Sequence, residues 1–466
     1  MSAIDRFYGL YQHVPVALQD LMVSGYGWIL KRRRYGAEHD RTLAALMESR
    51  LLSYERIREL ELGRLQETLA YAAAQVPHYR ELWKTIGFDP RDVKRFEDIR
   101  SLPVTEKAEV KAAPERFVSD EYRAGKHGTL YKGNTSGTTG KPLTTYKDKG
   151  CYQRVWAHQE RQRLQWGIEG KGARVSIGVR PVVPMGQTAP PFWRHDRSEN
   201  NWHFSNFHIA EATLDAYVAK IVEIQPEEIN AYPSGVFLVA AHALRRGETR
   251  IRPKTVITCA ETLYADQRRT IEQAFACKVA DQYGAAEVVF WIGQCPHGTY
   301  HVSHEFGHVE ALDGTTPVVG RPGDAVGTGF VNRAQVLVRY RLGDSIVLPE
   351  RWTPCPCGWQ TDAIETIVGR IDDVLYTPDG RALGRLDIVL KKIDGVLESQ
   401  LVQDENDHLT IHLVPEEGPV PAAEETIRGR LVDYFGPAMR IDFRWVETIP
   451  RTAAGKFRYQ VYAVRR

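Results

Sequence analysis

The sequence predicts an α/β fold with a large N-terminal domain of layered sheets and helices and a small α+β C-terminal domain. Its 466 residues are about three times the length of a typical domain, so more than one core is expected. From about residue 128, short apolar runs punctuated by Gly and Pro alternate with helical stretches. Such alternation of strands and helices is typical of an α/β body.

Each region shows its own pattern. Residues 1–100 carry charged and aliphatic residues at helical spacing, which predicts amphipathic helices. The α/β body is expected over 101–369 and the small domain over 370–466, because the turn-rich, charged segment 369–384 is typical of a junction. Strands are expected at 173–179, 255–260, 276–284, 334–344, 409–416 and 439–447, and helices at 212–225, 265–276 and 422–435.

Composition excludes several classes of protein. The chain is 43% hydrophobic and 26% charged, as in an ordinary globular protein. Its 61 Lys and Arg nearly balance 59 Asp and Glu, so no nucleic acid partner is expected. No apolar run reaches the roughly 18 residues of a transmembrane segment, and the first residues lack a signal-peptide pattern. We therefore expect a cytoplasmic protein.

One basic run leaves two interpretations open. Lys31-Arg32-Arg33-Arg34 follows a stretch that contains Leu18, Leu21, Met22, Trp28, Ile29 and Leu30. Such a run is more often a solvated helix end. The alternative is weak association with an anionic membrane surface.

A glycine-rich segment, Gly133-Asn134-Thr135-Ser136-Gly137-Thr138-Thr139-Gly140-Lys141, predicts phosphate binding. Its glycines let backbone N–H groups turn toward one point, while hydroxyl groups and a lysine add donors and charge. It is not a P-loop, because Thr135 and Pro142 stand where that motif requires Gly and Ser or Thr. The alternative is a flexible linker. The candidate ligands of the phosphates are Thr135, Ser136, Gly137, Thr138, Thr139 and Lys141.

The segment TSGTTGKPL resembles the phosphate loop of the adenylate-forming superfamily, and further motifs follow in the family's order. These are CAE at 259–261, YGAAE at 283–287, YRLGD at 340–344, GRIDD at 369–373 and TAAGK at 452–456. Over about residues 60–466 the chain is similar to the branch of phenylacetate-CoA ligases, coenzyme F390 synthetases and CapK-like proteins. The segments PPFWR at 190–194, FSNFH at 204–208 and YPS at 232–234 resemble CapK-type members in particular.

This resemblance implies ATP as a substrate, Mg²⁺ as its counter-ion and a role for each motif residue. It also implies that the small domain is mobile and rotates about a hinge between two half-reactions. The implied roles are Ala260 and Glu261 along adenine, Tyr283 stacked on adenine, Glu287 on Mg²⁺, Asp344 on the ribose hydroxyls, Arg370 near ribose and phosphate, Asp372 as hinge and Lys456 as catalytic lysine.

The implied reaction joins a small carboxylic acid to AMP with release of pyrophosphate, and Lys456 would bridge the two anions. The acyl group then passes to the thiol of CoA, as in phenylacetate-CoA ligase-like enzymes. The alternative is a CapK-like adenylase that forms an amide or ester with an amine or hydroxyl acceptor. Two departures from the family's pattern, Ala286 and the segment TPDGRALG, bear on the choice of acceptor.

Aromatic residues supply candidates for the acid pocket, although aromatic runs more often belong to a core. The candidates are Phe204, His208, Tyr232 and Trp291.

Two short segments, 295–301 and 355–358, gather thiols and imidazoles, the ligands that zinc prefers in closed tetrahedral sites. The phenylacetate-CoA ligase-like branch has a similar set of residues. We expect one structural zinc ion bound by Cys295, His301, Cys355 and Cys357, and His297 is the alternative to His301.

The segment His304-Glu305-Phe306-Gly307-His308 matches the H-E-x-x-H signature of zinc metalloproteases. That chemistry requires a helix, whereas Gly307 and the valines beside the motif favour a strand. On a strand the two histidines would lie about 13 Å apart, too far to share one ion. The sequence therefore predicts no protease site here.

Overall fold

The computed structural model describes residues 11–134, 143–178, 180, 182–184, 186–370, 375–378, 382–383, 386, 390, 393–451 and 457–464. Two compact units make up the chain. Unit 1 comprises Met1–Gly25, Gly170–Val279 and Val368–Arg466, and unit 2 comprises Tyr26–Glu169 and Ala280–Ile367. Each unit is interleaved in sequence with the other. The division into domains 1–369 and 370–466 stays a prediction.

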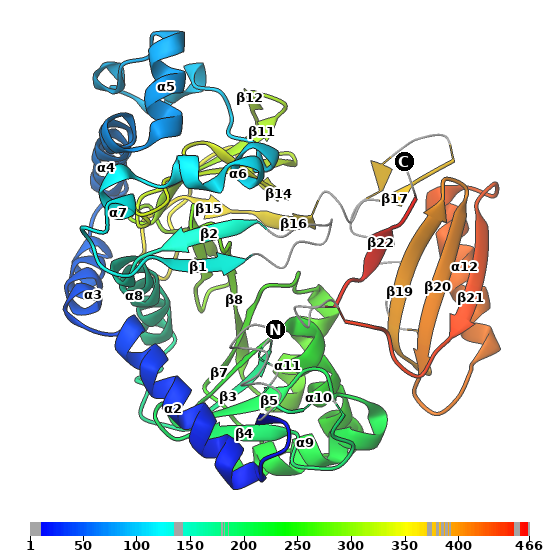
Figure 1. The fold of residues 1–466 in the computed structure, drawn as a ribbon. Helices are drawn as coiled ribbons and strands as arrows, with labels where there is room; N and C mark the ends of the chain where they lie inside the picture. The colour runs from blue at the N-terminus through cyan, green and yellow to red at the C-terminus, as the bar shows by residue number, and fades with distance from the viewer. Residues whose placement is uncertain are drawn as a thin grey trace. The chain divides into compact units, whose positions relative to one another are not determined.

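Residues 170–279 of unit 1 form a mostly parallel sheet with helices packed on it (Figure 1). The strand order is β7-β6-β3-β5-β4, in which only the edge strand β4 is antiparallel to its neighbour. Parallel strands need helical crossovers, and the expected helices supply them. The elements are β3 (Arg174–Gly178), β4 (Trp193–Asp196), β5 (Asn201–Ser205), α9 (Glu211–Ile224), β6 (Glu228–Ala231), α10 (Pro233–Arg245), β7 (Thr255–Cys259) and α11 (Ala265–Phe275).

The last part of unit 1 is a four-stranded sheet, β21-β20-β19-β22, covered by helix α12 (Figure 1). Ile427 and Leu431 of the helix are buried against Leu401 and Ile411 of the sheet. The expected α+β arrangement is confirmed. The elements are β17 (Leu375–Tyr376), β18 (Ala382–Leu383), β19 (Val396–Glu405), β20 (His408–Pro415), α12 (Pro421–Phe435), β21 (Arg440–Trp445) and β22 (Gln460–Tyr462), and they follow β16 (Thr366–Arg370), a strand of the second sheet of unit 2.

Helices dominate the first half of unit 2, as the sequence predicts. The longest, α4, begins where the Ser53 side chain accepts the Arg56 N–H, an ordinary N-cap. None of the helices in the described ranges has both the length and the apolar character needed to cross a membrane. The helices are α2 (Val16–Arg34), which continues from unit 1, α3 (Ala37–Ser49), α4 (Tyr54–Gln75), α5 (Pro77–Ile86), α6 (Lys107–Ala112), α7 (Asp120–Arg123) and α8 (Lys149–Gln165), with short 3₁₀ turns at Pro90–Asp92, Phe96–Ser101 and Pro114–Phe117.

The strands of unit 2 form three groups. In the first group the strands lie in the order β8-β9-β10-β15, and β8 begins at the end of unit 1. The second group is a sheet with the order β12-β11-β13-β14-β16. The third is the two-stranded ribbon β1-β2. The strands are β1 (Tyr131–Asn134), β2 (Thr144–Lys147), β8 (Lys278–Gly284), β9 (Trp291–Gln294), β10 (Tyr300–Val302), β11 (Gly307–Asp313), β12 (Thr316–Pro317), β13 (Gly323–Gly329), β14 (Tyr340–Val347) and β15 (Ala363–Ile364).

Gly307 shows why β11 starts where it does. A Cβ atom at this position would lie 2.0 Å from the carbonyl oxygen of Val289, so only glycine lets the strand pass. Residues 304–306, just before it, form a turn. The expectation of one strand through both His304 and His308 is therefore wrong for His304.

A buried ion pair joins β11 to the segment before β14. Arg339, which is 2% exposed, donates two hydrogen bonds of 2.9 Å to the carboxylate of Glu310. It also donates to the backbone carbonyl of Leu102, which ties the 3₁₀ turn 96–101 to the sheet.

Glu310→Gln should destabilise unit 2 because it leaves the buried guanidinium of Arg339 without a counter-charge. The expected loss is about 3–5 kcal/mol in the free energy of unfolding, measured by urea denaturation. The matched control is Asp313→Asn, which breaks the exposed pair with Arg321 and should cost less than about 1 kcal/mol. Equal losses in the two variants would contradict the assignment.

Candidate functional site

Two of the predicted nucleotide motifs bind each other in unit 2. The Tyr283 hydroxyl of β8 donates to Asp344 Oδ2 at 2.9 Å, and the Tyr340 hydroxyl of β14 donates to Glu287 Oε1 at 3.2 Å. Each motif thus supplies a tyrosine to the carboxylate of the other. The reciprocal bonds tie Glu287, three residues after the end of β8, and Asp344, within β14, into one arrangement.

Glu287 is buried, and a lysine lies close to its carboxylate. The residue is 7% exposed, and Lys107 Nζ lies 3.9 Å from its Oε1 atom. Burial, followed by the charge of Glu287, raises the pKa of Tyr340, which keeps that hydroxyl protonated as a donor. The sequence indicated neither Lys107 nor the role of Tyr340, since Lys107 lies outside every motif and meets Glu287 only through folding.

The Trp291 ring packs against Gly284, in the motif that contains Tyr283 and Glu287. A Cβ atom at Gly284 would lie 3.1 Å from the Trp291 ring, so glycine allows the indole to approach the strand. Trp291 is 9% exposed and packs with Cys151, Val288 and Phe306.

The other three aromatic candidates lie in unit 1. Phe204 is 1% exposed and packs 5.3 Å from Trp193 and 5.6 Å from Tyr217, between ring centroids. His208 Nδ1 lies 2.7 Å from the Ser205 hydroxyl. Tyr232 is 6% exposed and directly precedes α10. These surroundings match the alternative that the sequence left open, a core position, most closely for Phe204.

Glu261 occupies a different environment from the one expected along a nucleotide. Its Oε2 atom accepts the Ser234 N–H at 3.0 Å, and its Oε1 atom accepts the Phe457 N–H at 2.5 Å. Burial raises the pKa of this carboxyl group, although the two backbone donors and Arg451 oppose the rise. Ala260 beside it has a φ of 68°, a left-handed conformation. The carboxylate therefore joins α10 to the chain next to Lys456.

The chain on both sides of residues 452–456 is held in place. Arg451 forms an ion pair of 2.5 Å with Glu398, and its guanidinium lies 4.7 Å from the centre of the Phe457 ring. Two residues further on, the ring of Tyr459 lies 4.9 Å from that of Tyr264 in unit 1.

Several predicted residues lie outside the described part of the chain. The side chain of Arg370, at the end of β16, is also not described. β1 and β2, which flank the glycine-rich segment, form an antiparallel ribbon with Asn134 opposite Thr144. The residues outside the description are Thr135, Ser136, Gly137, Thr138, Thr139, Lys141, Asp372 and Lys456.

The four expected metal ligands come together in unit 2. β10 pairs with β9 and with β15, which brings the segments of Cys295, His301, Cys355 and Cys357 side by side. Their ligand atoms all lie within 4.8 Å of one another. His297 is exposed and is not one of the four, so the geometry selects His301.

The spacing of these atoms matches a zinc site. Cys295 Sγ and Cys355 Sγ are 3.7 Å apart, and Cys357 Sγ lies 3.3 Å from His301 Nε2. A tetrahedron with Zn–S bonds of about 2.3 Å has edges of about 3.8 Å. The other imidazole nitrogen, Nδ1, bonds to the Thr361 hydroxyl at 2.9 Å, as the outer partner of a zinc-bound histidine does.

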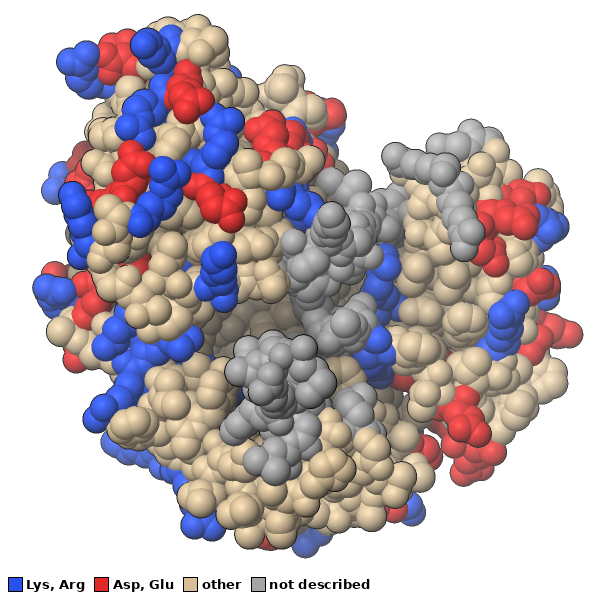
Figure 2. Space-filling model, in the orientation of Figure 1, with Lys and Arg blue, Asp and Glu red and all other residues tan. Residues whose placement is uncertain are grey.

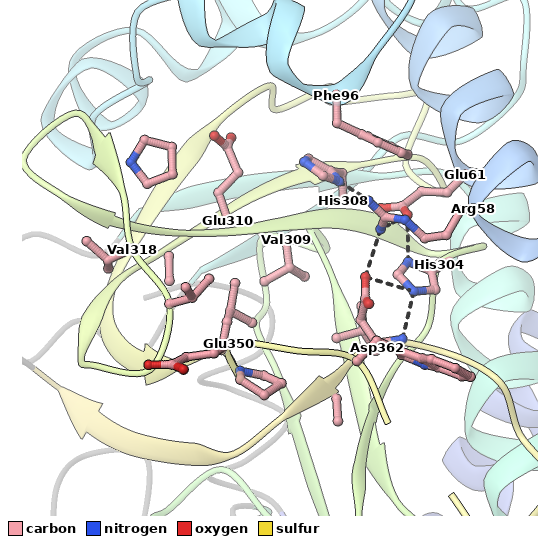
Figure 3. A pocket seen from close by; sticks show the side chains of 18 of the residues that line it. Arg58, Glu61, Phe96, His304, His308, Val309, Glu310, Val318, Glu350 and Asp362 are labelled. Atoms are coloured by element: carbon pink, nitrogen blue, oxygen red, sulfur yellow. Dashed lines mark hydrogen bonds and ion pairs between the residues drawn. The ribbon is translucent and has the colours of Figure 1, made fainter. Parts of the chain in front are cut away.

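The two histidines of the H-E-x-x-H segment converge on one carboxylate. His304 Nδ1 and His308 Nδ1 each lie 2.7 Å from an oxygen of Glu61, which is fully buried in α4 (Figure 3). The predicted separation of about 13 Å is therefore wrong, because the turn 304–306 redirects His304 toward β11. Burial alone raises the pKa of Glu61, but the two histidines outweigh it and hold that pKa below its usual range.

The positive charge in this cluster comes from the Arg58 guanidinium, and the residues are not arranged as in a zinc protease. Arg58 bonds Glu61 at 2.5 Å and Asp362 at 2.8 Å, so the guanidinium balances both carboxylates. Glu305 of the segment forms an ion pair with Arg161 at 2.8 Å instead of facing the histidines. The cluster forms one end of a cavity of about 340 Å³, whose other end carries Val318 together with the carboxylates of Glu310 and Glu350 (Figure 3).

Known proteins are similar to this chain in sequence and in fold. The CapK C-terminal domain family matches residues 375–462. Protein CapK of Staphylococcus aureus is 26% identical over 98% of this chain and 99% of its own length. A phenylacetate-coenzyme A ligase of Thermus thermophilus is 23% identical over 88% of this chain and 97% of its own length.

A solved structure of 2-hydroxyisobutyryl-CoA ligase in the postadenylation state, with R3-HIB-AMP bound, superposes with a TM-score of 0.69. It is 20% identical and covers 89% of this chain and 91% of its own, which shows a shared fold. The chain is an adenylate-forming ligase. It resembles the branch of CapK-like and phenylacetate-CoA ligase-like proteins in the adenylate-forming superfamily.

Proposed function

We propose that this enzyme activates a small carboxylic acid with ATP, releases pyrophosphate, and passes the acyl group from the acyl adenylate to an acceptor. The observation that carries the proposal is the reciprocal bonding of Tyr283 with Asp344 and of Tyr340 with Glu287. It supports one nucleotide site, in which Asp344 binds the ribose hydroxyls and Glu287 binds the Mg²⁺ ion of the phosphates.

In the first half-reaction an oxygen of the carboxylate attacks the α-phosphorus of ATP, and the bond to the bridging oxygen of pyrophosphate breaks. Two anions must approach one another, so positive charge has to lie on both sides. We assign that charge to Lys456 and Lys141. Mg²⁺, when bound by Glu287, would neutralise the leaving phosphates.

The other assignments follow the resemblance. Thr135, Ser136, Gly137, Thr138 and Thr139 would hold the phosphates with their hydroxyl and backbone N–H donors. Tyr283 and Ala260 would border adenine, Arg370 would bind near the ribose and phosphate, and Asp372 would act as the hinge. Phe204, His208, Tyr232 and Trp291 are the proposed lining of the acid pocket.

Two acceptors fit the proposal. Relatives named phenylacetate-coenzyme A ligase support the thiol of CoA. An amine or hydroxyl acceptor without CoA is the alternative that the resemblance to CapK-like adenylases implies, and the chain matches protein CapK over almost its whole length. No nucleic acid partner and a cytoplasmic location remain expectations.

Pyrophosphate release from ATP, measured across aryl, fatty and amino acids with and without CoA, tests the proposal. Release that depends on an acid is expected from the wild type. Lys456→Ala should lower it by about a hundred- to a thousandfold, because a charge aimed at the transition state is lost. The matched control is Lys94→Ala, an exposed lysine outside every motif, which should leave the rate unchanged.

Formation of a thioester with CoA would identify the ligase reaction, whereas release that ignores CoA would direct the assay to amines and hydroxyls. If Lys456→Ala releases pyrophosphate normally, the catalytic role of Lys456 is wrong.

We further propose that Glu261 positions the chain next to Lys456 and does not bind the nucleotide through its carboxylate. Glu261→Ala should lower kcat for pyrophosphate release by up to about a hundredfold, because a small displacement of a reacting group is enough for such a loss. The KM for ATP should change little. Glu261→Gln keeps one acceptor oxygen and should recover part of the rate.

If Glu261→Ala has a normal kcat and a raised KM for ATP, the positioning role is wrong. Glu261 would then contact the adenine of ATP, as the family resemblance implies.

Zinc bound by Cys295, His301, Cys355 and Cys357 is the structural part of the proposal. The purified protein should contain about one zinc ion per chain, and Cys355→Ser should lose most of it together with thermal stability. Removing the outer partner with Thr361→Val should weaken zinc binding by about 10–100-fold. Metal analysis and thermal unfolding provide the readouts.

Cys277→Ser is the control, because Cys277 lies outside the cluster, and it should keep its zinc. Unchanged zinc content in Cys355→Ser would exclude the site.

A further inference from the structure

Helix α2 exposes an apolar face that a folded chain ordinarily buries. Of the ten large hydrophobic residues exposed in the described part of the chain, five lie in this helix. The exposed fractions are 46% for Leu18, 67% for Leu21, 55% for Tyr26, 49% for Trp28 and 50% for Ile29. Single exposed hydrophobic residues are ordinary, but a contiguous group marks an interaction surface.

Four of these residues lie on one side of the helix. Leu18, Leu21, Trp28 and Ile29 follow helical spacing, and a Cβ atom added at Gly25, between them, would meet no atom within 4 Å. The opposite side, with Gln19, Gly27 and Leu30, is buried. We call the four residues and Gly25 the α2 face.

The inward side of α2 is fixed to the protein, which leaves the α2 face outward. Gln19 accepts a hydrogen bond of 2.5 Å from Arg194 and donates one of 3.0 Å to the Tyr11 carbonyl oxygen. Further along, the guanidinium of Arg34 lies 4.1 Å from the centre of the Trp156 ring. The helix therefore cannot turn its apolar face inward without breaking these contacts.

The charges of α2 are basic and gather at one end. Lys31, Arg32, Arg33 and Arg34 occupy the last turn, and the first turn has no acidic residue. The single acidic residue of the helix, Asp20, accepts the His195 N–H at 3.0 Å. Figure 2 shows mostly blue and tan surface at the lower left, where Figure 1 draws α2.

Trp28 and Arg32 join the apolar and basic parts of this surface. The Arg32 guanidinium lies 4.0 Å above the Trp28 ring, and both side chains are exposed. A tryptophan beside an arginine suits the boundary between lipid headgroups and acyl chains, where an apolar ring and a cation are both stabilised.

We infer that α2 lies in the plane of a membrane surface, with the α2 face among the acyl chains and Lys31 and Arg32 among anionic lipid headgroups. The complementary charge selects anionic lipid over a neutral one, because each cation near such a surface adds attraction. The helix lies on the surface and does not cross it. The inference does not depend on the acid or the acceptor of the proposed function.

Vesicle flotation of the full-length protein tests the inference. Vesicles of phosphatidylcholine with phosphatidylglycerol should carry the protein upward, vesicles of phosphatidylcholine alone should carry much less, and added salt should weaken the binding. Trp28→Glu should reduce binding by at least about tenfold, because a charge replaces an apolar anchor. Lys31→Glu with Arg32→Glu should abolish the preference for phosphatidylglycerol.

The matched control is Leu51→Glu, which places the same charge at a leucine that is 83% exposed outside α2. It should float like the wild type. Thermal unfolding of Trp28→Glu close to that of the wild type excludes misfolding as the cause.

Equal flotation of Trp28→Glu and wild type, or no flotation with either vesicle, would overturn the inference. A dimer in light scattering that Trp28→Glu converts to a monomer, without vesicle binding, would also overturn it and assign the α2 face to a second copy of the chain.

Discussion

Buried carboxylates that need partners from distant segments organise this molecule. An unpaired buried charge is strongly unfavourable, so each such carboxylate fixes the segments that supply its partners. Glu61 of α4 requires His304, His308 and Arg58, and Glu310 of β11 requires Arg339. Through these contacts the N-terminal helices and the sheets of unit 2 are held in one arrangement.

The same constraint acts at the proposed active site. Glu287 and Asp344 each bond a tyrosine from the other's motif, so the two motifs cannot shift independently. In unit 1 the Glu261 carboxylate bonds the backbone N–H groups of Ser234 and Phe457. A motif residue expected to border a nucleotide thus connects a helix start to the chain beside Lys456. Contacts of this kind link the proposed catalytic residues to the folding of the chain.

Two further features do not depend on the chemistry of acid activation. Cys295, His301, Cys355 and Cys357 form a compact donor set on neighbouring strands, which supports a structural metal near the end of one sheet. The α2 face supports attachment to a lipid surface. An enzyme that activates an acid on a membrane would meet acids or acceptors that partition into lipid, and this connects the two proposals without making either depend on the other.

The sequence by itself determined the α/β class, the helical character of the first hundred residues, and the helix and strands of the last hundred. It also indicated the three cysteines of the candidate metal site, with His301 or His297 as the fourth residue, and the structure then brought His301 to the cysteines. These features depend on periodicity, on turn residues and on ligand chemistry, which are local properties of the chain. Only the tertiary structure decided that His304 and His308 share Glu61, that Lys107 approaches Glu287, that Glu261 binds Phe457, and that α2 turns its apolar side outward. Each of these depends on which distant segments meet, and no local pattern in one sequence specifies that.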